Sequence, residues 1–490
     1  MNNIRSKFKK RIPSCLNILL RNYILRKVTA YNFDTYIYKK IVEKSSLYTK
    51  EIRYERYKIL SDLLIILQKA LTDKNISPNV KKKIINVFIC RIMLKNRNKN
   101  RDDFVEEFKC EPPGFITINP CKKCNLNCIG CFVKNSSNAA EKLDYETINK
   151  IIKEKTDLWD SFFTVISGGE PFLWHSNDKD IIDLCCAHPE NYFMIYTNGT
   201  LINKVMAERI AEAGNITLAV SLEGFEKDTD ERRGKGVFKK ILEAMDNLRK
   251  AGVPFGIALT ATRSNAERIL SDEFLNFFFE KLGALYGWIF QYMPIGPDKN
   301  FSLMVSPEQR KWMFEREKQI IHDKNIFLPD FWNGGIYSSG CLAGGRPGGY
   351  ISIDWNGNVT PCVFYPYSKL NINQIYAKGG NINDTLKSDL MVEIRKWQRE
   401  YGFEKKGKEV HNLIAPCGFR DHYDITYNLL QKINPEPVDE DAKKVLNDKT
   451  YFNELLNYEN EFNNITENIW QNDFIKPEDE GNPLKIIIEM

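Results

Sequence analysis

The chain has 490 residues with 12 Cys, a formal net charge of +6 and 43% hydrophobic residues. This composition excludes a disordered or low-complexity chain, and the length is enough for more than one domain. The basic start at residues 5–11 precedes only a short apolar run that Arg21 interrupts, unlike a secretory signal. We therefore expect a cytoplasmic protein, in which clustered cysteines bind metal rather than form disulfides.

The first hundred residues differ in charge from the rest of the chain. They hold 24 Lys and Arg against 6 Asp and Glu, a net +18 that leaves about −12 for the remainder. Apolar patches at 60–67 and 84–89 predict amphipathic helices, and no apolar run reaches the roughly 20 residues that span a bilayer. Two interpretations stay open: a helical cap on the next domain, or peripheral contact with an anionic membrane surface. No nucleic-acid-binding motif is present, so we expect no nucleic acid partner.

Three cysteines follow a predicted first strand at 115–119. Cys124, Cys128 and Cys131 lie in the run Cys-Asn-Leu-Asn-Cys-Ile-Gly-Cys. Three thiolates on one loop can each hold one iron of a four-iron cluster and leave the fourth iron open to a small molecule. Cys121 comes three residues earlier, so four thiolates could instead close a structural zinc site. Taken alone, the cysteine spacing leaves both alternatives open.

The next stretch alternates short apolar strands with amphipathic helices. Strands are predicted at 162–166, 193–195, 216–220, 253–259 and 288–293, and helices at 144–159, 201–213, 238–251 and 274–282. Polar, Gly-rich segments follow the strands at 167–171, 196–200 and 221–224. About six strand–helix units predict an α/β fold with a parallel sheet, a partial (β/α)6 TIM-type barrel. The cysteine loop and these segments then lie at the carboxyl ends of the strands, where such barrels build their active sites.

These residues resemble the radical S-adenosylmethionine superfamily from about Gly114 to Gly296. The similarity consists of Cys-x-x-x-Cys-x-x-Cys, Gly-Gly-Glu-Pro after the second strand and Ser-x-Glu-Gly after the fourth. It implies that Cys124, Cys128 and Cys131 hold a [4Fe–4S] cluster with S-adenosylmethionine on the open iron, and that Cys121 is structural. Two departures stand out: Gly130 replaces an aromatic residue common in relatives, and Glu223 stands where many have Asp.

The resemblance also implies a set of residues around S-adenosylmethionine. Gly168 and Gly169 let backbone approach the methionyl amine, Glu170 is an anionic acceptor near it, and Pro171 fixes the turn. Ser221 and either Arg232 or Arg233 contact the ribose and carboxylate, while the segment containing Ile295 packs on the adenine. The cofactor-binding set as a whole is Gly168, Gly169, Glu170, Pro171, Asn198, Ser221, Glu223, Arg232, Arg233 and Ile295.

A second metal site is predicted downstream. Cys341 and Cys362 flank residues 350–361, which read as a hairpin with an Asn-Gly turn, and Cys417 is the last cysteine of the chain. The pattern is similar to the start of a SPASM or twitch domain, and implies one auxiliary iron–sulfur cluster with these three ligands. Its fourth position is open or is filled by Asp421, His422 or Cys110. The alternative is three buried cysteines around a hairpin.

These expectations divide the chain into four parts: a basic helical region at 1–108, a radical S-adenosylmethionine barrel at 109–300, a SPASM/twitch-like auxiliary region at 301–425, and a helical or flexible tail at 426–490. The resemblance implies reductive cleavage of S-adenosylmethionine to a 5′-deoxyadenosyl radical, with flavodoxin or ferredoxin as reductant. The expected substrate is a peptide or protein. The alternatives are a lipid or other membrane-associated small molecule, and a non-catalytic iron–sulfur electron carrier, against which the Gly-Gly-Glu-Pro segment argues.

Overall fold

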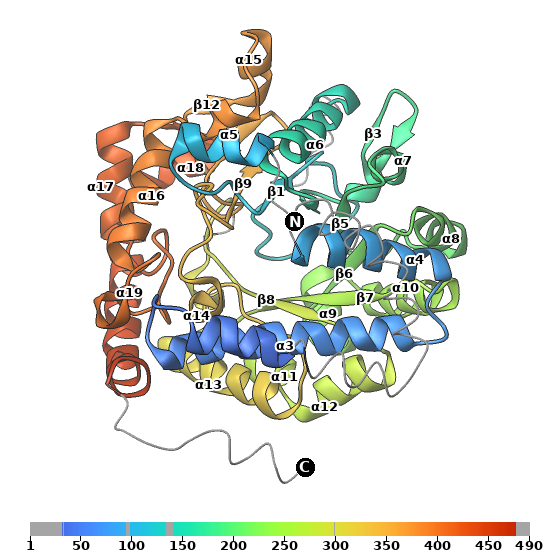
Figure 1. The fold of residues 1–490 in the computed structure, drawn as a ribbon, viewed down its shortest axis with the longest axis horizontal. Helices are drawn as coiled ribbons and strands as arrows, with labels where there is room; N and C mark the ends of the chain where they lie inside the picture. Colours follow the sequence, from blue (N-terminus) through green and yellow to red (C-terminus); the bar gives the residue numbers. More distant parts are fainter. Residues whose placement is uncertain (1–31, 33, 95–98, 134–140, 298, 477–490) are drawn as a thin grey trace, which may run out of the picture.

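The computed structural model describes residues 32, 34–94, 99–133, 141–297 and 299–476. Its centre is a nine-stranded sheet in the order β12-β10-β9-β1-β2-β5-β6-β7-β8, with helices arranged around it (Figure 1). The strands of this sheet are β1 (Phe115–Ile118), β2 (Phe163–Ile166), β5 (Tyr192–Thr197), β6 (Ile216–Leu222), β7 (Phe255–Ala261), β8 (Gly287–Gln291), β9 (Tyr350–Ile353), β10 (Asn358–Thr360) and β12 (Leu370–Asn371).

Six of these strands form the predicted partial barrel. β1, β2, β5, β6, β7 and β8 pair with their neighbours in parallel, in chain order. The connections between them carry α6 (Tyr145–Trp159), η3 (Pro171–Leu173), β3 (His175–Ser176), β4 (Lys179–Asp180), α7 (Ile181–Ala187), α8 (Lys204–Ala213), α9 (Glu226–Arg233), α10 (Val237–Ala251), α11 (Ala266–Ile269), α12 (Asp272–Leu275) and η4 (Asn276–Lys281). The α/β barrel expected from the alternating pattern is therefore confirmed.

Element boundaries differ from the sequence prediction by a few residues where caps decide them. β7 begins at Phe255 rather than at Val253, because Gly252 ends α10 in a left-handed conformation with φ 74°. The Val253 amide then donates to the Leu248 carbonyl, which completes the helix cap before the strand can start. Likewise α8 begins after Asn203, whose side chain accepts from the Met206 amide.

The predicted hairpin is present, and it joins the barrel sheet. β9 and β10 pair antiparallel around a turn in which Gly357 has φ 85°. β9 also pairs in parallel with β1, with Phe115 opposite Tyr350. The auxiliary region is thus continuous with the barrel through hydrogen-bonded strands.

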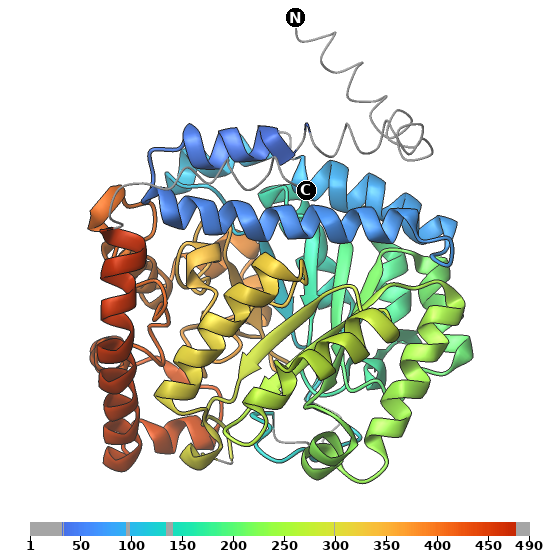
Figure 2. The same cartoon turned by 90° about the horizontal axis from the view of Figure 1, so that it is seen from below.

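The N-terminal helices cover one end of the barrel. They are η1 (Lys39–Glu43), α3 (Lys50–Thr72), α4 (Pro78–Lys83), η2 (Ile84–Met93) and α5 (Lys99–Phe108), and α3 runs across the molecule in Figure 2. Val80, Ile84 and neighbouring apolar side chains pack with Phe163 and Tyr192, the first residues of β2 and β5. This favours the cap interpretation, with the cap on the amino ends of the strands. Residues 1–31, which hold the basic start, lie outside the described residues; within the described part, no helix is long and apolar enough to cross a bilayer.

The C-terminal helices form a second core beside the hairpin. The elements of this part are η5 (Phe301–Leu303), α13 (Pro307–Asp323), α14 (Gly335–Ser338), β11 (Tyr367–Ser368), α15 (Ile372–Ala377), η6 (Ile382–Leu386), α16 (Asp389–Tyr401), η7 (Gly407–Glu409), α17 (Tyr423–Ile433), β13 (Glu436–Pro437), α18 (Glu440–Val445), α19 (Lys449–Ile469) and η8 (Trp470–Ile475). Buried aromatic residues such as Trp332, Tyr423 and Trp470 fill this core. α17 and α19 line one side of the molecule in Figure 1.

Candidate functional site

The loops after β1 and β2 are bonded to each other at the carboxyl end of the sheet. The Gly169 amide donates to the Cys121 carbonyl at 2.9 Å, and the Glu170 amide donates to the Lys123 carbonyl at 2.8 Å. A Cβ on Gly169 would lie 2.2 Å from the Lys123 oxygen, closer than any real contact. Glycine is therefore required here by the approach of the two loops, a reason that the sequence did not reveal.

Glu170 connects the loop after β2 to the loop after β5. Its Oε1 accepts from the Thr197 hydroxyl at 2.8 Å, and its Oε2 accepts from the Asn198 amide at 2.9 Å. Burial raises the pKa of Glu170 to about 7, against the lowering effect of these donors. Both oxygens thus already serve the chain itself, so Glu170 holds the loop geometry in addition to any contact with a ligand amine.

The three predicted cluster ligands lie together on the loop after β1. Cys124, Cys128 and Cys131 are each partly buried. Burial raises the pKa of Cys124 to about 11 and also raises that of Cys131; repulsion from Cys128 and Cys131 adds at Cys124, and repulsion from Cys128 adds at Cys131. The Cys131 amide donates to the Cys128 carbonyl at 3.2 Å, which holds these two cysteines in one turn.

The donor set of the triad suits a four-iron cluster, because each of the three thiolates can bind its own iron. Among the described residues, no group of three Cys, His, Asp or Glu side chains is gathered closely enough to hold a single metal ion. Cys121 is buried, and its thiol lies 3.7 Å from the carbonyl oxygens of Lys123 and Glu170. Its place is inside the loop–loop contact.

Two arginines on α9 face the thiols across a buried carboxylate. Arg233 binds Glu223 through Nε at 2.6 Å and Nη2 at 2.7 Å, and Arg232 Nη1 binds Glu223 Oε1 at 2.6 Å. Burial alone would raise the pKa of Glu223, but the two guanidinium groups lower it below its usual value. Arg232 Nη1 also contacts Thr260 Oγ1, whereas Arg233 Nη1 lies 4.0 Å from Cys128 Sγ. The neighbours of the two arginines therefore differ, although both share one carboxylate.

The remaining predicted contact residues lie around the same loops. Asn198 Nδ2 donates to Asn125 Oδ1 at 2.8 Å and lies 3.8 Å from Cys124 Sγ. Ser221 is on β6 opposite Ala258 of β7, and Ile295 is buried in the segment after β8. Pro171 begins η3, directly after Glu170.

Gly130 stands where an aromatic side chain is common among radical S-adenosylmethionine enzymes, and the structure shows what lies there instead. Gly130 has φ 67°, and a Cβ on it would lie 2.6 Å from Cε2 of Tyr292. The ring of Tyr292, which follows β8, occupies that space. An aromatic contact is thus kept beside the third cysteine, but it comes from another strand end.

The second group of cysteines is brought together by the fold. Cys341, Cys362 and Cys417 line one largely apolar pocket. Burial raises the pKa of Cys362 to about 12 and that of Cys417 well above its usual value, and repulsion between the cysteines raises both further. The other residues of the lining include Met293, Phe331, Trp332, Phe364, Tyr365, Trp397 and Phe419. Three mutually close thiols in an apolar pocket suit an iron–sulfur cluster.

Two residues that the sequence did not single out support this pocket. The Tyr350 hydroxyl donates to Cys362 Sγ at 3.0 Å. Arg346 is buried, and its guanidinium donates to the carbonyls of Ser338, Gly340, Cys341 and Pro347. No carboxylate among the described residues forms an ion pair with Arg346, so an anionic cluster would supply the missing counter-charge. A tyrosine in a strand and an arginine in a Gly-rich loop carry no sequence signal for these roles.

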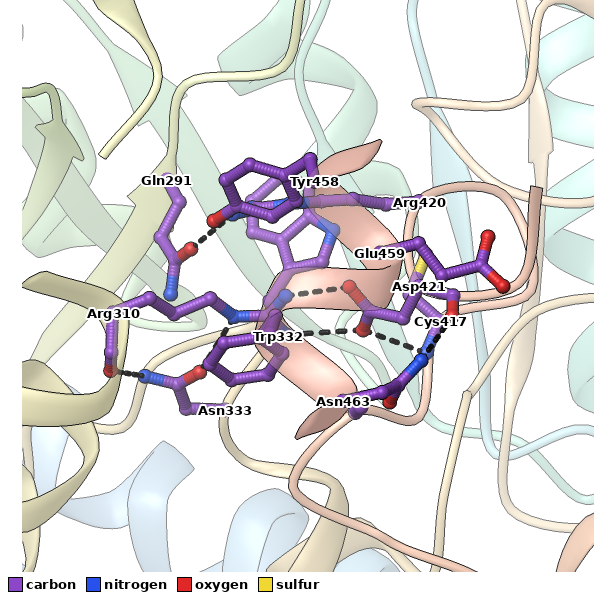
Figure 3. A network of polar contacts seen from close by, with 12 residues as sticks. Gln291, Arg310, Trp332, Asn333, Cys417, Arg420, Asp421, Tyr458, Glu459 and Asn463 are labelled. Carbon is purple, nitrogen blue, oxygen red and sulfur yellow. Dashed lines mark hydrogen bonds and ion pairs between the residues drawn. The ribbon is translucent and has the colours of Figure 1, made fainter. Parts of the chain in front are cut away.

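A buried ion pair anchors the segment that carries Cys417. Asp421 binds Arg310 of α13 through both oxygens, with Arg310 Nη2 at 3.0 Å from Oδ2 (Figure 3). Asp421 Oδ2 also accepts from the Cys417 amide at 3.1 Å. Arg420 extends the network to Gln291 at the end of β8, with Nη2 at 2.6 Å from Oε1. The cysteine is thereby held against the barrel.

None of the three candidates for the fourth cluster position, Asp421, His422 and Cys110, lines the cysteine pocket. Asp421 is committed to Arg310, and His422 Nε2 bonds the Ala415 carbonyl at 2.9 Å. Cys110 lines a different depression with Arg395 and Arg399, one that shares no lining residue with the cysteine pocket.

Aromatic side chains fill the space between the two cysteine sites. Phe132 follows Cys131, and its ring centroid lies 5.4 Å from that of Phe364, which is two residues after Cys362. Phe364 in turn contacts Phe331 and Trp332. The two sites are therefore linked by contacts between aromatic rings.

Comparisons with known proteins agree with this geometry. Residues 118–269 match the sequence model of the Radical SAM superfamily. The mycofactocin maturase MftC of Mycolicibacterium smegmatis is 27% identical over 311 residues, which cover 60% of this chain and 76% of the maturase. The AdoMet-dependent heme synthase of Methanosarcina barkeri is 29% identical over 54% of this chain and 80% of its own length.

A solved structure shares the fold. The structure of Streptococcus suis SuiB bound to S-adenosylmethionine aligns with a TM-score of 0.51 and 19% identity, over 65% of this chain and 75% of SuiB. Enzymes of this superfamily use a [4Fe–4S] cluster together with S-adenosylmethionine. The parallel barrel, the three-cysteine loop at its carboxyl end and the match at 118–269 together show that this chain contains a Radical SAM domain.

Proposed function

We propose that this chain is a peptide- or protein-modifying radical S-adenosylmethionine enzyme with two iron–sulfur clusters. One cluster is held by Cys124, Cys128 and Cys131, and the auxiliary cluster by Cys341, Cys362 and Cys417. The observation that carries the proposal is the convergence of the last three cysteines, from distant segments, on one pocket next to the loop after β1.

The bound groups supply the radical, and the chain positions them. When bound, the loop cluster and S-adenosylmethionine, with one electron from a flavodoxin- or ferredoxin-type reductant, supply a 5′-deoxyadenosyl radical that takes hydrogen from a substrate C–H bond. Glu170 and Gly169 fix the loops around that site, and Glu223 holds both α9 arginines beside the thiols. The rings of Phe132 and Phe364 place apolar surface between the two cysteine sites.

The assignment to a peptide or protein substrate draws on the relatives. MftC is named a maturase, and the Clostridium perfringens relative is a cysteine-type anaerobic sulfatase-maturating enzyme, 23% identical over 62% of this chain. The MftC match covers 311 residues, more than the 118–269 domain, so it includes sequence outside the barrel core. The heme synthase relative supports a second candidate, a small molecule of the tetrapyrrole class.

The test uses full-length protein, purified and reconstituted without oxygen. With S-adenosylmethionine and dithionite, we expect 5′-deoxyadenosine, and we expect a peptide encoded by a neighbouring gene to raise its yield and to change in mass. The Cys128→Ala variant is the matched control and should form none. Stimulation by a tetrapyrrole and by no peptide would instead assign the small-molecule reaction. Formation of no 5′-deoxyadenosine at all would leave an electron carrier.

A further inference from the structure

Tyr350 links the parts of the auxiliary cysteine pocket. Its amide donates to the Leu342 carbonyl at 2.9 Å, and its carbonyl accepts from the Gly345 amide at 3.0 Å, so its backbone is bonded to the loop that carries Cys341. Its hydroxyl donates to the sulfur of Cys362 at 3.0 Å. Tyr350 is thus hydrogen-bonded to Cys362 through its side chain and to the loop that carries Cys341 through its backbone.

The barrel holds this tyrosine in place. Tyr350 is 2% exposed, and its ring stacks on Phe115 of β1 with centroids 4.9 Å apart and an angle of 10° between the planes. Phe115 is also its partner in the parallel pairing of β1 and β9. The hydroxyl is therefore aimed at Cys362 by strand register and stacking, at little additional cost in side-chain entropy.

We propose that Tyr350 is a positioning residue that raises the reduction potential of the auxiliary cluster by donating a hydrogen bond to the Cys362 thiolate. This inference rests on the auxiliary cluster of the proposed function. Reduction adds negative charge to the cluster and its thiolates, and a hydrogen bond to a charged sulfur strengthens as that charge grows. Hydrogen bonds to cluster sulfurs are among the protein's means of setting the potential.

The Phe364 amide is the second donor to the same sulfur, at 3.4 Å. Because it belongs to the backbone, it remains in every side-chain variant. Replacement of Tyr350 by phenylalanine removes the hydroxyl and keeps the stacked ring, so it isolates the contribution of one hydrogen bond.

Tyr365 is the matched control. It lines the same pocket and is 5% exposed, but its hydroxyl has no hydrogen bond to a cysteine among the described residues. Tyr365→Phe therefore removes a buried hydroxyl near the cluster without removing a donor to sulfur.

The measurement is an anaerobic redox titration followed by electron paramagnetic resonance. It uses the full chain with Cys124, Cys128 and Cys131 replaced by alanine, so that only the auxiliary cluster contributes. At a fixed potential we expect Tyr350→Phe to lower the ratio of reduced to oxidised cluster about fivefold, the effect of one hydrogen bond worth about 1 kcal/mol. The resonance line shape should change as well, and Tyr365→Phe should leave both unchanged.

Three results would overturn the inference. An unchanged ratio in Tyr350→Phe, or an equal shift in Tyr365→Phe, removes the role of Tyr350 while the cluster itself stands. If circular dichroism shows that the three-alanine protein is folded but the protein contains no iron, both the auxiliary cluster and the inference about Tyr350 are wrong. If that protein does not fold, the two phenylalanine variants are compared with all cysteines present, and the two clusters are titrated separately.

Discussion

The two cysteine sites reach the same donor number by opposite routes. Cys124, Cys128 and Cys131 lie within one short loop, whereas Cys341, Cys362 and Cys417 come from a Gly-rich loop, a hairpin end and the turn before α17. The first site depends on local spacing. The second depends on strand register, on the Arg310–Asp421 ion pair and on Arg346. We therefore expect the first site to respond to changes of its ligands, and the second also to changes far from its sulfurs.

The largest effects are expected when one cysteine ligand of either site is replaced, because each replacement removes a different cluster. Cys128→Ala should reduce 5′-deoxyadenosine to background and lower the iron content from about eight to about four per chain. Cys362→Ala should lower iron similarly but keep the cleavage of S-adenosylmethionine, because the loop cluster remains. Iron analysis and chromatography of the nucleoside measure both. About four irons per chain in the unaltered protein would show that only one of the two cysteine sites holds a cluster.

The next effect tests whether a distant ion pair supports the second site. Arg310→Met leaves the carboxylate of Asp421 buried without its partner, and should lower the free energy of unfolding by about 3–5 kcal/mol. Denaturant unfolding measures this change, and iron analysis should show preferential loss of the auxiliary cluster. Lys311→Ala on the same helix removes an exposed pair with Glu315 and should cost about 0.5 kcal/mol or less. Equal losses in the two variants would show that the buried pair has no special role.

A smaller effect concerns the first site and depends on pH. Burial raises the pKa of Glu170 to about 7 in the folded chain, against its ordinary value of 4.5 in an unfolded chain. Between these values the folded state binds more protons, so the carboxyl lowers stability as pH rises toward 7 and the loss is constant above it. In apoprotein, the advantage of Glu170→Gln over wild type should grow by up to about 3 kcal/mol from pH 4.5 to 8. Denaturant unfolding across this range measures it, and a pH-independent difference would contradict the raised pKa.

The smallest effect concerns a single contact in the first site. Ser221→Ala should raise the KM for S-adenosylmethionine about three- to tenfold with little change in kcat, as expected for loss of one hydrogen bond to the cosubstrate. Ser302→Ala, on η5, is the control and should leave KM unchanged. A fall in kcat at constant KM would place Ser221 outside the binding contacts.

The contrast between the sites also explains what could be predicted. The loop triad, the Gly-Gly-Glu-Pro turn and the Asn356-Gly357 hairpin are local patterns, and the sequence shows them directly. The parallel pairing of β9 with β1 joins residues more than two hundred positions apart, and no local pattern specifies it. The same holds for Arg310 with Asp421, since a lone arginine on an amphipathic helix carries no mark of its partner.

The sequence of the N-terminal region leaves a membrane contact and a helical cap open for a physical reason. An amphipathic helix with basic residues suits a membrane surface and a protein surface alike, because both accept its apolar face. Val80 and Ile84 pack against the amino ends of the barrel strands, which gives that apolar face a protein partner. Which interpretation is right depends on the surface that the apolar face contacts, and the sequence of the helix does not specify that surface.

The ladder between β1 and β9 has a consequence for how insertions and slips are tolerated. The stretch from β8 to β9 carries α13 and α14, so only the turns between these elements can vary in length at low entropic cost, since loop closure depends only weakly on loop length. A shift of one residue in the ladder is different, because side chains alternate between the faces of a sheet. Such a slip would turn Tyr350 away from Phe115 and Cys362 and put Ile351 in its place. Relatives of this chain should therefore differ in the length of the turns between β8 and β9, while the pairing register of β1 with β9 stays the same.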